Sequence, residues 1–580
     1  MNFLLVAAAA LVSVGTGLDP FTRSGQSLNG EWKYIVDPMR TGLPFWNDVP
    51  QDGRKLVQWD FFTAPSIRVP GDWNTQDERL FFYEGRVWYR KRFHAAAAAD
   101  RRSILRFGAV NYHASVYLDG EKVGEHEGGF TPFAFDITEA LLKTNGEHSL
   151  VVGVENLRRP ERVPCEAFDW WNYGGITRDV TIFSVPRTYI AEGVIQCAKG
   201  DRGRLAGFIR LSGREAGRRA RIRIPELGVH AAAATGEDGV ARFEIHARPE
   251  LWSPENPRLY EVVFSIDGDE FSDRIGFRTI ETLGRNVFLN GRRILLKGAC
   301  VHDEAPFKSA RVHSADQVAP MIRWAKEMGC NYLRLAHYPH YEATVRELEK
   351  AGVMVWDEVP VYWNIKWDDA DTYANAEAQL AAMIRRDANR GNVIIWSVAN
   401  ETPVSDARNR FLGSLVAKVR EMDSTRLVSA ALLHVGEGNV IKVEDPLSEL
   451  VDLVSFNAYV GWYWSSSDEA KTFTFDIPYD KPVIVSEFGG GAVAGRHGGA
   501  DERWTEEFQA AIYRSNLAMF EKIDGLAGLS PWNLIDFRSP IRLADGIQSM
   551  YNRKGLVSDQ GGKKLAYEVM REFYARWQPK

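Results

Sequence analysis

Two kinds of hydrophobic pattern follow one another along the chain. From about Ser27 to Thr282, short segments such as "RVWYRKRF" and "RARIRIPEL" alternate apolar with polar residues, with turn residues between them. This period of two is typical of half-buried strands. After about Leu283, short apolar runs such as "VIIWSVANE" alternate with amphipathic stretches such as "YEATVRELEKAG". The pattern predicts β domains followed by an α/β domain.

The alternating half divides into two parts. Residues 19–187 carry several strands at the spacing of a β-sandwich, and the Asp-Gly in "YLDGEKVG" predicts a tight hairpin. Residues 188–282 carry a further half-dozen strands, which fits a smaller immunoglobulin-like sandwich of about a hundred residues.

Residues 283–580 predict a (β/α)8 barrel, because they hold about eight strand and helix units, as that fold requires. A barrel of this kind carries its chemistry at the C-terminal ends of its strands. The predicted strands end in these residues: His302, Asp303, Glu304, Arg334, His337, Asp357, Glu358, Asn400, Glu401, Asn457, Tyr459, Glu487 and Trp532. Any one could be structural, but so many polar or aromatic endings on one rim favour a functional site.

Composition narrows the classes of function. The chain has 580 residues, 45% hydrophobic and 26% charged, with a net charge of −6, which describes a multi-domain globular protein without the basic excess that nucleic acid requires. Aromatic residues reach 12%, and they serve either large cores or flat apolar faces for sugars. The four cysteines have no disulfide or zinc spacing, so we expect no metal and no cofactor.

The first 18 residues contain an apolar run of signal-peptide length, "MNFLLVAAAALVSVGTG", although the run lacks a basic start and a clear cleavage site. We expect this segment to direct export to the periplasm or the exterior. The alternative is a buried N-terminal segment of a cytoplasmic protein. No later run reaches the length of a membrane span.

Among the residues at the strand ends, Glu401 and Glu487 indicate a specific chemistry most clearly. They follow the fourth and seventh predicted strands and would face each other across the barrel mouth. Glycoside cleavage needs two such carboxyl groups, one that protonates the leaving oxygen and one that attacks the anomeric carbon. Two unrelated salt-bridging glutamates are the weaker alternative.

Three neighbours fit this interpretation. Arg334 could pair with the nucleophile and keep it charged, since an opposite charge lowers a carboxylate pKa. Asn400 could donate to a sugar hydroxyl, and Trp532 could offer an apolar face. Their structural alternatives are an ion pair inside the barrel, a strand-end cap and a core tryptophan. Other chemistries fit less well, because the chain has no phosphate-loop Gly-Lys, no metal-ligand spacing and no G-x-S-x-G.

The chain resembles glycoside hydrolase family 2, and within it the β-glucuronidases, from about Gln26 to the C-terminus. The motifs that carry the resemblance, in the family's order, include "SLNGEWKY", "DWWNYGGITRDV", "NYLRLAHYPH", "WSVANE", "FNAYVGWY" and "VIVSEFG". The resemblance implies a sugar-binding jelly roll, an immunoglobulin-like sandwich and a catalytic barrel. It also implies a retaining enzyme with Glu401 as acid/base and Glu487 as nucleophile.

The resemblance also implies a set of substrate-binding residues. Asp169 would reach the barrel from the first sandwich and bind a sugar hydroxyl. The other implied positions in the sugar site are His337, Asn400, Tyr459, Tyr463 and Trp532. Family relatives are often dimers or tetramers, so a homodimer or homotetramer is expected.

An Asn-x-Lys element separates glucuronidases from other members of the family. Here "YNRKG" supplies Asn552 and Lys554, and a buried cation beside an amide would make charge-assisted bonds to a sugar carboxylate. A basic surface turn is the alternative. The preceding segment, 532–551, departs from the family pattern, and a carboxylate-binding arginine has no clear counterpart. Arg538 or Arg542 could replace it.

Three functions therefore remain open. The leading one is removal of a terminal β-D-glucuronic acid. The second is the same machinery acting on a β-galactoside, a β-galacturonide or an arabinoside. The third is a carbohydrate-binding protein without catalysis, against which the intact pair Glu401 and Glu487 speaks.

Overall fold

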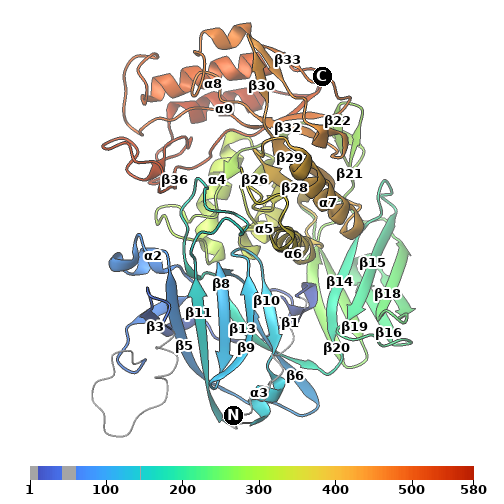
Figure 1. Ribbon diagram of the computed structural model, residues 1–580. Coiled ribbons are helices and arrows are strands. Elements are labelled where there is room, and N and C mark those ends of the chain that lie inside the picture. The colour runs from blue at the N-terminus through green and yellow to red at the C-terminus, as the bar shows by residue number, and fades with distance from the viewer. Residues whose placement is uncertain (1–10, 13, 42–60, 144–145, 580) are drawn as a thin grey trace.

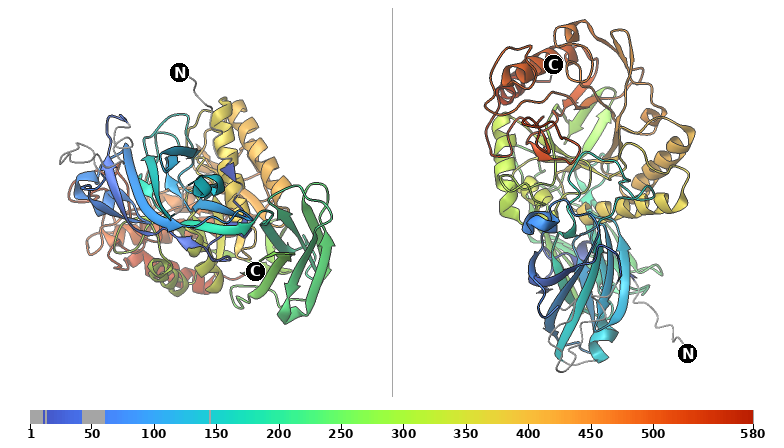
Figure 2. Two further views of the ribbon diagram at one scale, coloured as in Figure 1. Left: turned by 90° about the horizontal axis from the view of Figure 1, so that it is seen from below. Right: turned by 60° about the vertical axis from the view of Figure 1, so that its left-hand side comes forward.

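The computed structural model describes residues 11–12, 14–41, 61–143 and 146–579, which form three domains (Figure 1). In that view the first domain lies at the bottom, the second beside it, and the third above both. Figure 2 shows the same arrangement from below and from one side. Among the described residues, none of the helices combines the length and the apolar character needed to cross a bilayer.

The first domain is a two-layer β-sandwich. One layer has the order β1 (Leu11–Val12), β10 (Phe133–Asp136), β6 (Arg101–Phe107), β13 (Val180–Pro186) and β2 (Gln26–Ser27). The other has the order β4 (Ser66–Val69), β3 (Gly30–Val36), β5 (Arg86–Ala95), β11 (Gly146–Glu155), β8 (His113–Leu118) and β9 (Glu121–Glu127). Apolar residues of both layers form one core. The predicted hairpin is confirmed, because β8 and β9 are joined by Asp119 and Gly120, both with positive φ.

Smaller elements complete the first domain. They are α2 (Trp73–Gln76), α3 (Thr138–Lys143), β7 (Val110–Asn111) and β12 (Gly175–Ile176). Residues 14–18 also belong to its packed structure: Leu18 is fully buried, and the Thr16 hydroxyl donates to the Gly193 carbonyl at 2.9 Å. Part of the predicted export segment is therefore buried against the second domain, and its cleavage stays a prediction.

The second domain packs two smaller sheets face to face. The first has the order β14 (Ile190–Cys197), β15 (Arg204–Leu211) and β18 (Val240–His246). The second has the order β17 (Val229–Ala234), β16 (Arg219–Ile224), β19 (Tyr260–Ile266) and β20 (Asp269–Ile275). Apolar side chains alternate inward along these strands and make a separate core. The short sheet β21 (Ile280–Leu283), β22 (Asn286–Leu289) and β23 (Arg292–Ile294) leads into the third domain.

The third domain is a closed parallel barrel. Its strands, in order, are β24 (Leu296–Lys297) with β25 (Cys300–Val301), β26 (Tyr332–Leu335), β27 (Met354–Glu358), β28 (Val393–Asn400), β29 (Leu427–Leu432), β32 (Val454–Asn457), β34 (Val483–Glu487) and β35 (Leu526–Leu529). The short segments β24 and β25 together act as the first strand, because β24 pairs with β35 and β25 pairs with β26. The three architectures confirm the predicted fold class.

The helices around the barrel are less regular than the sequence pattern predicts. Six α-helices surround its described part: α4 (Ala319–Met328), α5 (Glu342–Lys350), α6 (Ala370–Asp387), α7 (Asp406–Met422), α8 (Glu506–Phe520) and α9 (Leu565–Arg576). After β29 and β32, the 3-10 helices η5 (Pro446–Glu449) and η6 (Glu469–Thr472) take the place of α-helices. There the chain also forms a small sheet of β30 (Val435–Glu437), β31 (Val440–Lys442) and β33 (Thr474–Asp476).

A loop of the first domain reaches the mouth of the barrel. It connects β11 to β12 and carries Phe168 and Trp170 into an apolar cluster with barrel residues such as Tyr362 and Trp532. Figure 1 shows the loops at this end of the sandwich rising toward the barrel domain. The first domain therefore supplies part of whatever site the barrel mouth contains.

Candidate active site

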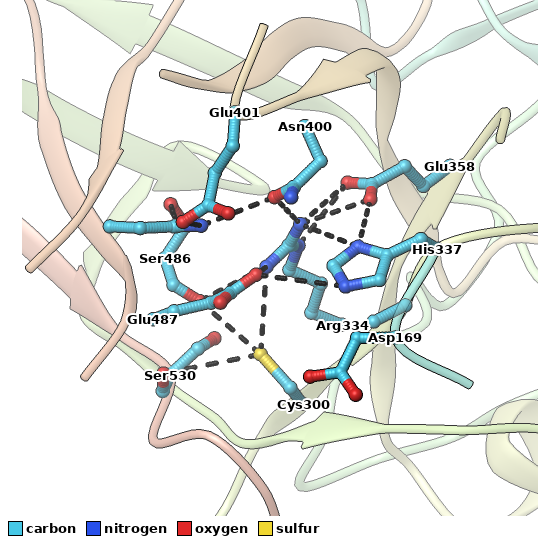
Figure 3. Close-up of polar contacts among 12 residues, drawn as sticks. Asp169, Cys300, Arg334, His337, Glu358, Asn400, Glu401, Ser486, Glu487 and Ser530 are labelled. Atoms are coloured by element: carbon cyan, nitrogen blue, oxygen red, sulfur yellow. Dashed lines mark hydrogen bonds and ion pairs between the residues drawn. The ribbon is translucent and has the colours of Figure 1, made fainter. Parts of the chain in front are cut away.

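The two glutamates that the sequence singles out lie on the same rim of the barrel. Glu401 directly follows β28, the fourth strand, and Glu487 is the last residue of β34, the seventh. All eight residues of β28 are buried, so the strand forms part of the barrel wall up to Asn400. Figure 3 shows the side chains of Glu401 and Glu487 directed toward one cluster of polar groups.

Arg334, from β26, is the centre of that cluster and is fully buried. Its guanidinium donates to Glu487 Oε1 at 2.6 Å, to Glu358 Oε1 at 3.0 Å and to Asn400 Oδ1 at 2.8 Å. One cation thus contacts polar residues at the ends of the third, fourth and seventh strands. This is the ion pair with the nucleophile candidate that the sequence predicted.

Arg334 acts on Glu487 in the predicted direction, but its charge does not decide the net shift of the Glu487 pKa. Burial raises the pKa of the Glu487 carboxyl, and the charge of Arg334 opposes this rise without cancelling it. Arg334 also serves Glu358: burial acts against ionisation there too, but Arg334 and His337 together lower the pKa of Glu358 to about 2. The charge of Arg334 therefore also stabilises the ionised form of Glu358, a residue that was not predicted from the sequence as a site residue.

Glu358 should make the stability of the protein sensitive to acid. Its pKa lies below the ordinary value of 4.5, so its contribution is present above that pH and is lost as the pH falls toward about 2. The shift corresponds to about 3 kcal/mol. We expect Glu358→Gln to be less stable at neutral pH and to lose less stability on acidification, measured by urea unfolding between pH 6 and pH 3.

Glu347→Gln is the control for this measurement, since Glu347 lies on α5 and pairs with Lys350 at the surface. It should follow the unmodified protein at every pH. Parallel loss of stability in the Glu358→Gln variant and the unmodified protein would show that Glu358 does not carry the charge assigned to it.

Asn400 and Asn457 stand between the two glutamates. Asn457 donates to Glu401 Oε1 at 2.9 Å and to Asn400 Oδ1 at 3.2 Å, and its own oxygen accepts from Ser486 at 2.7 Å. The amide nitrogen of Asn400 is buried and has no hydrogen-bond partner in the part of the chain that the structure describes. A buried donor of this kind is costly unless a ligand satisfies it. Asn400 is thus suited to donate to a sugar hydroxyl.

Aromatic rings line one side of the cluster. Trp532 stacks on His337, with ring centroids 4.9 Å apart, and His337 Nδ1 lies 2.8 Å from Glu358 Oε1. Trp170, from the first domain, packs against His337 and Tyr362. The predicted apolar face of Trp532 is therefore joined by rings from another domain.

A second group of predicted residues begins beside Glu487. The Tyr459 hydroxyl donates to Glu487 Oε2 at 2.5 Å, and the Tyr459 ring lies 5.3 Å from that of Tyr463. The Lys554 ammonium donates to the Tyr463 hydroxyl at 2.8 Å and lies over both tyrosine rings. Burial lowers the pKa of Lys554, and the Tyr463 oxygen opposes this. Lys554 is 3% exposed and forms no ion pair with any described carboxylate.

Asp169 joins this second group from the first domain. Its carboxylate accepts from Ser539 Oγ at 2.5 Å, from Asn552 Nδ2 at 3.2 Å and, through both oxygens, from Arg542. Arg542 also reaches the Tyr463 hydroxyl, at 3.5 Å. The structure places Asp169 beside residues of the barrel domain, and the sugar contact assigned to it stays a prediction.

Other candidates lie outside this arrangement. Arg538 packs over Phe81 and Tyr551, so Arg542 is the arginine near Lys554. Asp303 pairs with Arg178 of the first domain at 3.3 Å, and Glu304 accepts from Tyr173 at 3.0 Å. These two rim residues join the domains.

Four residues of the site were not predicted from the sequence as site residues: Glu358, Trp363, Asn457 and Ser539. Glu358 and Asn457 were recognised at the ends of predicted strands. They could have been assigned to the site because Arg334 and Glu401 each need a polar partner. Trp363 and Ser539 lie on loops, where no hydrophobic period indicates which side chain turns inward. For these two the sequence alone carried no usable signal. Arg542 also lies on a loop, and the sequence offered it only together with Arg538.

Three models of known protein families match this chain. Residues 26–186 match the model of the glycosyl hydrolases family 2 sugar binding domain, residues 220–278 match a glycosyl hydrolases family 2 model, and residues 280–524 match the family 2 TIM barrel domain. The three matches together cover most of the chain.

Relatives and solved structures agree with these matches. A beta-glucuronidase of Streptococcus agalactiae is 27% identical, with 85% of this chain and 88% of that protein covered. One from Paenibacillus borealis is 26% identical, with 96% and 98% covered. The structure of Bifidobacterium dentium beta-glucuronidase complexed with coumarin-3-O-glucuronide is 25% identical and matches with a TM-score of 0.83 over 96% of this chain and 98% of that one. The chain therefore belongs to glycosyl hydrolase family 2 and is a glycoside hydrolase.

Proposed function

We propose that this protein is a retaining exo-β-glucuronidase that removes terminal β-D-glucuronic acid. The observation that carries the proposal is the buried Lys554 ammonium, which forms no ion pair with any described carboxylate and contacts Tyr463 and aromatic faces. Burying an unpaired cation is expensive, and such groups are typical of sites that await an oppositely charged ligand. The C6 carboxylate of a glucuronic acid would supply that charge.

Neighbouring groups support a carboxylate ligand at this position. The backbone N–H of Lys554 donates to Asn552 Oδ1 at 3.2 Å, which holds Asn552 beside the ammonium. Arg542 and Lys554 both contact the Tyr463 hydroxyl, and their charges lower the pKa of Tyr463 although burial acts in the opposite direction. Arg542 is paired with Asp169, so Lys554 supplies the net positive charge at this edge of the site. Arg542 would replace the arginine that the sequence does not supply at the family's usual place.

The proposed reaction has two steps. In the first, the Glu487 carboxylate attacks the anomeric carbon while Glu401 gives its proton to the glycosidic oxygen, and the bond from carbon to that oxygen breaks. In the second, Glu401 takes a proton from water, and the water oxygen attacks the same carbon and releases Glu487. Asn400 donates to a hydroxyl beside the reacting carbon, with its free amide nitrogen.

The test is a comparison of substrates with a Lys554→Ala variant. We expect the unmodified protein to hydrolyse p-nitrophenyl β-D-glucuronide in preference to the β-galactoside, β-galacturonide and α-arabinoside. Lys554→Ala should lower kcat/KM for the glucuronide at least about a hundredfold, or about 2.7 kcal/mol, because a charge-assisted contact is lost in a desolvated site.

Lys563→Ala is the matched control, since Lys563 is half-exposed and pairs with Glu327 at the surface. It should retain full activity. An equal loss of activity on the galactoside in Lys554→Ala would contradict the carboxylate role. Faster hydrolysis of the galacturonide than of the glucuronide would support the carboxylate role of Lys554 and would replace glucuronic acid by galacturonic acid as the proposed sugar.

A further inference from the structure

Both oxygens of the Glu401 carboxyl are held by neutral donors. Asn457 Nδ2 donates to Oε1 at 2.9 Å, and the indole nitrogen of Trp363 donates to Oε2 at 2.9 Å. An indole N–H and an amide N–H2 only donate, so neither can take a proton from a carboxylic acid. Among the described residues, no cation forms an ion pair with Glu401, whereas Arg334 pairs with Glu487.

The backbone around Trp363 is anchored to the strand that carries Glu401. The N–H of Trp363 donates to the Asn400 carbonyl at 3.0 Å, and the preceding Tyr362 forms an isolated bridge with Asn400. Trp363 and Glu401 both adopt the left-handed backbone region, with φ of 54° and 50°. This conformation is unfavourable for a residue other than glycine and persists only where surrounding contacts enforce it. Trp363 therefore has one defined position relative to Glu401.

Packing on the ring side fixes the indole as well. Its ring lies 4.5 Å from that of Tyr362, which in turn packs against Trp170 and His337 in the apolar cluster. Trp363 itself is only partly buried, so its position is at the open side of the cluster. The indole N–H is thus presented to Glu401 by a rigid neighbour rather than by a free loop.

We propose that Trp363 is a positioning residue that aims the protonated Glu401 carboxyl at the glycosidic oxygen. This inference rests on the proposed function. The only proton that moves in the first step passes from Glu401 to the leaving oxygen as its bond to carbon breaks. The indole N–H stays in place and stabilises the carboxylate that this transfer leaves behind.

The proposal predicts that the loss of kcat/KM on replacing Trp363 is larger when the leaving group needs a proton more. An alkoxide must be protonated as it leaves, whereas p-nitrophenolate departs with little help. Trp363→Phe keeps most of the ring and removes the donor. We expect its kcat/KM to fall about thirtyfold or more on methyl β-D-glucuronide, within the range of general acid catalysis, and no more than about threefold on p-nitrophenyl β-D-glucuronide.

The ratio of the two kcat/KM values is the quantity to measure, because both values scale with the folded fraction and their ratio does not. Trp367→Phe is the matched control: Trp367 lies on the same segment, but its ring packs edge-on against Phe411 at 5.3 Å. Its ratio should equal that of the unmodified protein.

Each outcome decides the proposal. An unchanged ratio in Trp363→Phe, including equal losses on both substrates, would overturn the positioning role and leave the proposed function standing. If the unmodified protein hydrolyses neither glucuronide, the proposed function fails and the inference fails with it. A lowered ratio in Trp363→Phe alone is the expected result.

Discussion

A Glu487→Gln variant is expected to lose at least about ten-thousandfold in kcat on p-nitrophenyl β-D-glucuronide, or about 5.4 kcal/mol. The amide has the size of the carboxylate and can still accept from the Tyr459 hydroxyl, but it is a far weaker nucleophile toward carbon. The loss should therefore be larger than that of any residue that only binds the sugar. It is measured from initial rates, with thermal unfolding as the check on folding.

Glu304→Gln is a suitable control for Glu487→Gln. Glu304 is also a carboxyl group near the rim, and burial raises its pKa to about 7, so the amide resembles its protonated form. Its contacts are to Tyr173 and to the backbone of Arg538. It should keep most of its activity. Activity of Glu487→Gln near that of the unmodified protein would exclude Glu487 as nucleophile.

The retaining mechanism adds a direct chemical readout. A 2-deoxy-2-fluoro glucuronyl fluoride slows both steps but keeps a good leaving group, so a glycosyl ester should accumulate on Glu487 in the unmodified protein. Mass spectrometry of peptides locates the label. A label on another residue would reassign the nucleophile, and first release of the α-anomer of the product would show inversion.

Replacing Glu401 with alanine should have an effect that depends on the leaving group. On methyl β-D-glucuronide we expect kcat/KM to fall about a thousandfold or more, because the leaving oxygen loses its proton donor. On the p-nitrophenyl glycoside kcat/KM should fall much less, while kcat falls because the second step has lost its base. The two substrates thus separate the acid role from the base role.

Azide provides the control for Glu401→Ala. It attacks the anomeric carbon without needing a base, so it should raise kcat of the variant on the aryl glycoside and yield a β-glycosyl azide. It should not raise kcat of Glu487→Gln to form the same β-product, since no intermediate forms there. Failure of azide to act on Glu401→Ala would argue that Glu401 is not the acid/base.

The sequence predicted the barrel and the strands that carry Glu401 and Glu487 because both follow from local patterns. A fully buried strand reads as a continuous apolar run, and the first polar residue after it lies on the rim. The same reasoning exposed Arg334 and Asn400, whose side chains now form one hydrogen-bonded cluster. Two carboxyl groups on one rim were therefore visible without any structure.

What the pattern could not predict lies on loops or depends on burial. The indole of Trp363 and the guanidinium of Arg542 approach the site from irregular segments, whose path is set by tertiary contacts. The direction of the Glu487 pKa shift also required the structure, because burial outweighs the nearby cation. The sequence shows which charged groups are present. Their burial in the fold decides whether desolvation or a neighbouring charge has the larger effect on a pKa.

The insertion of a first-domain loop into the barrel mouth couples two folding units through the substrate. A sugar held by Asp169 and by groups of the barrel would bind only the assembled pair of domains, so its binding free energy would be added to the interface between them. Saturating ligand should then protect the Asp169 loop and the barrel rim from hydrogen exchange together. Bound substrate would in this way stabilise the interface between the first domain and the barrel.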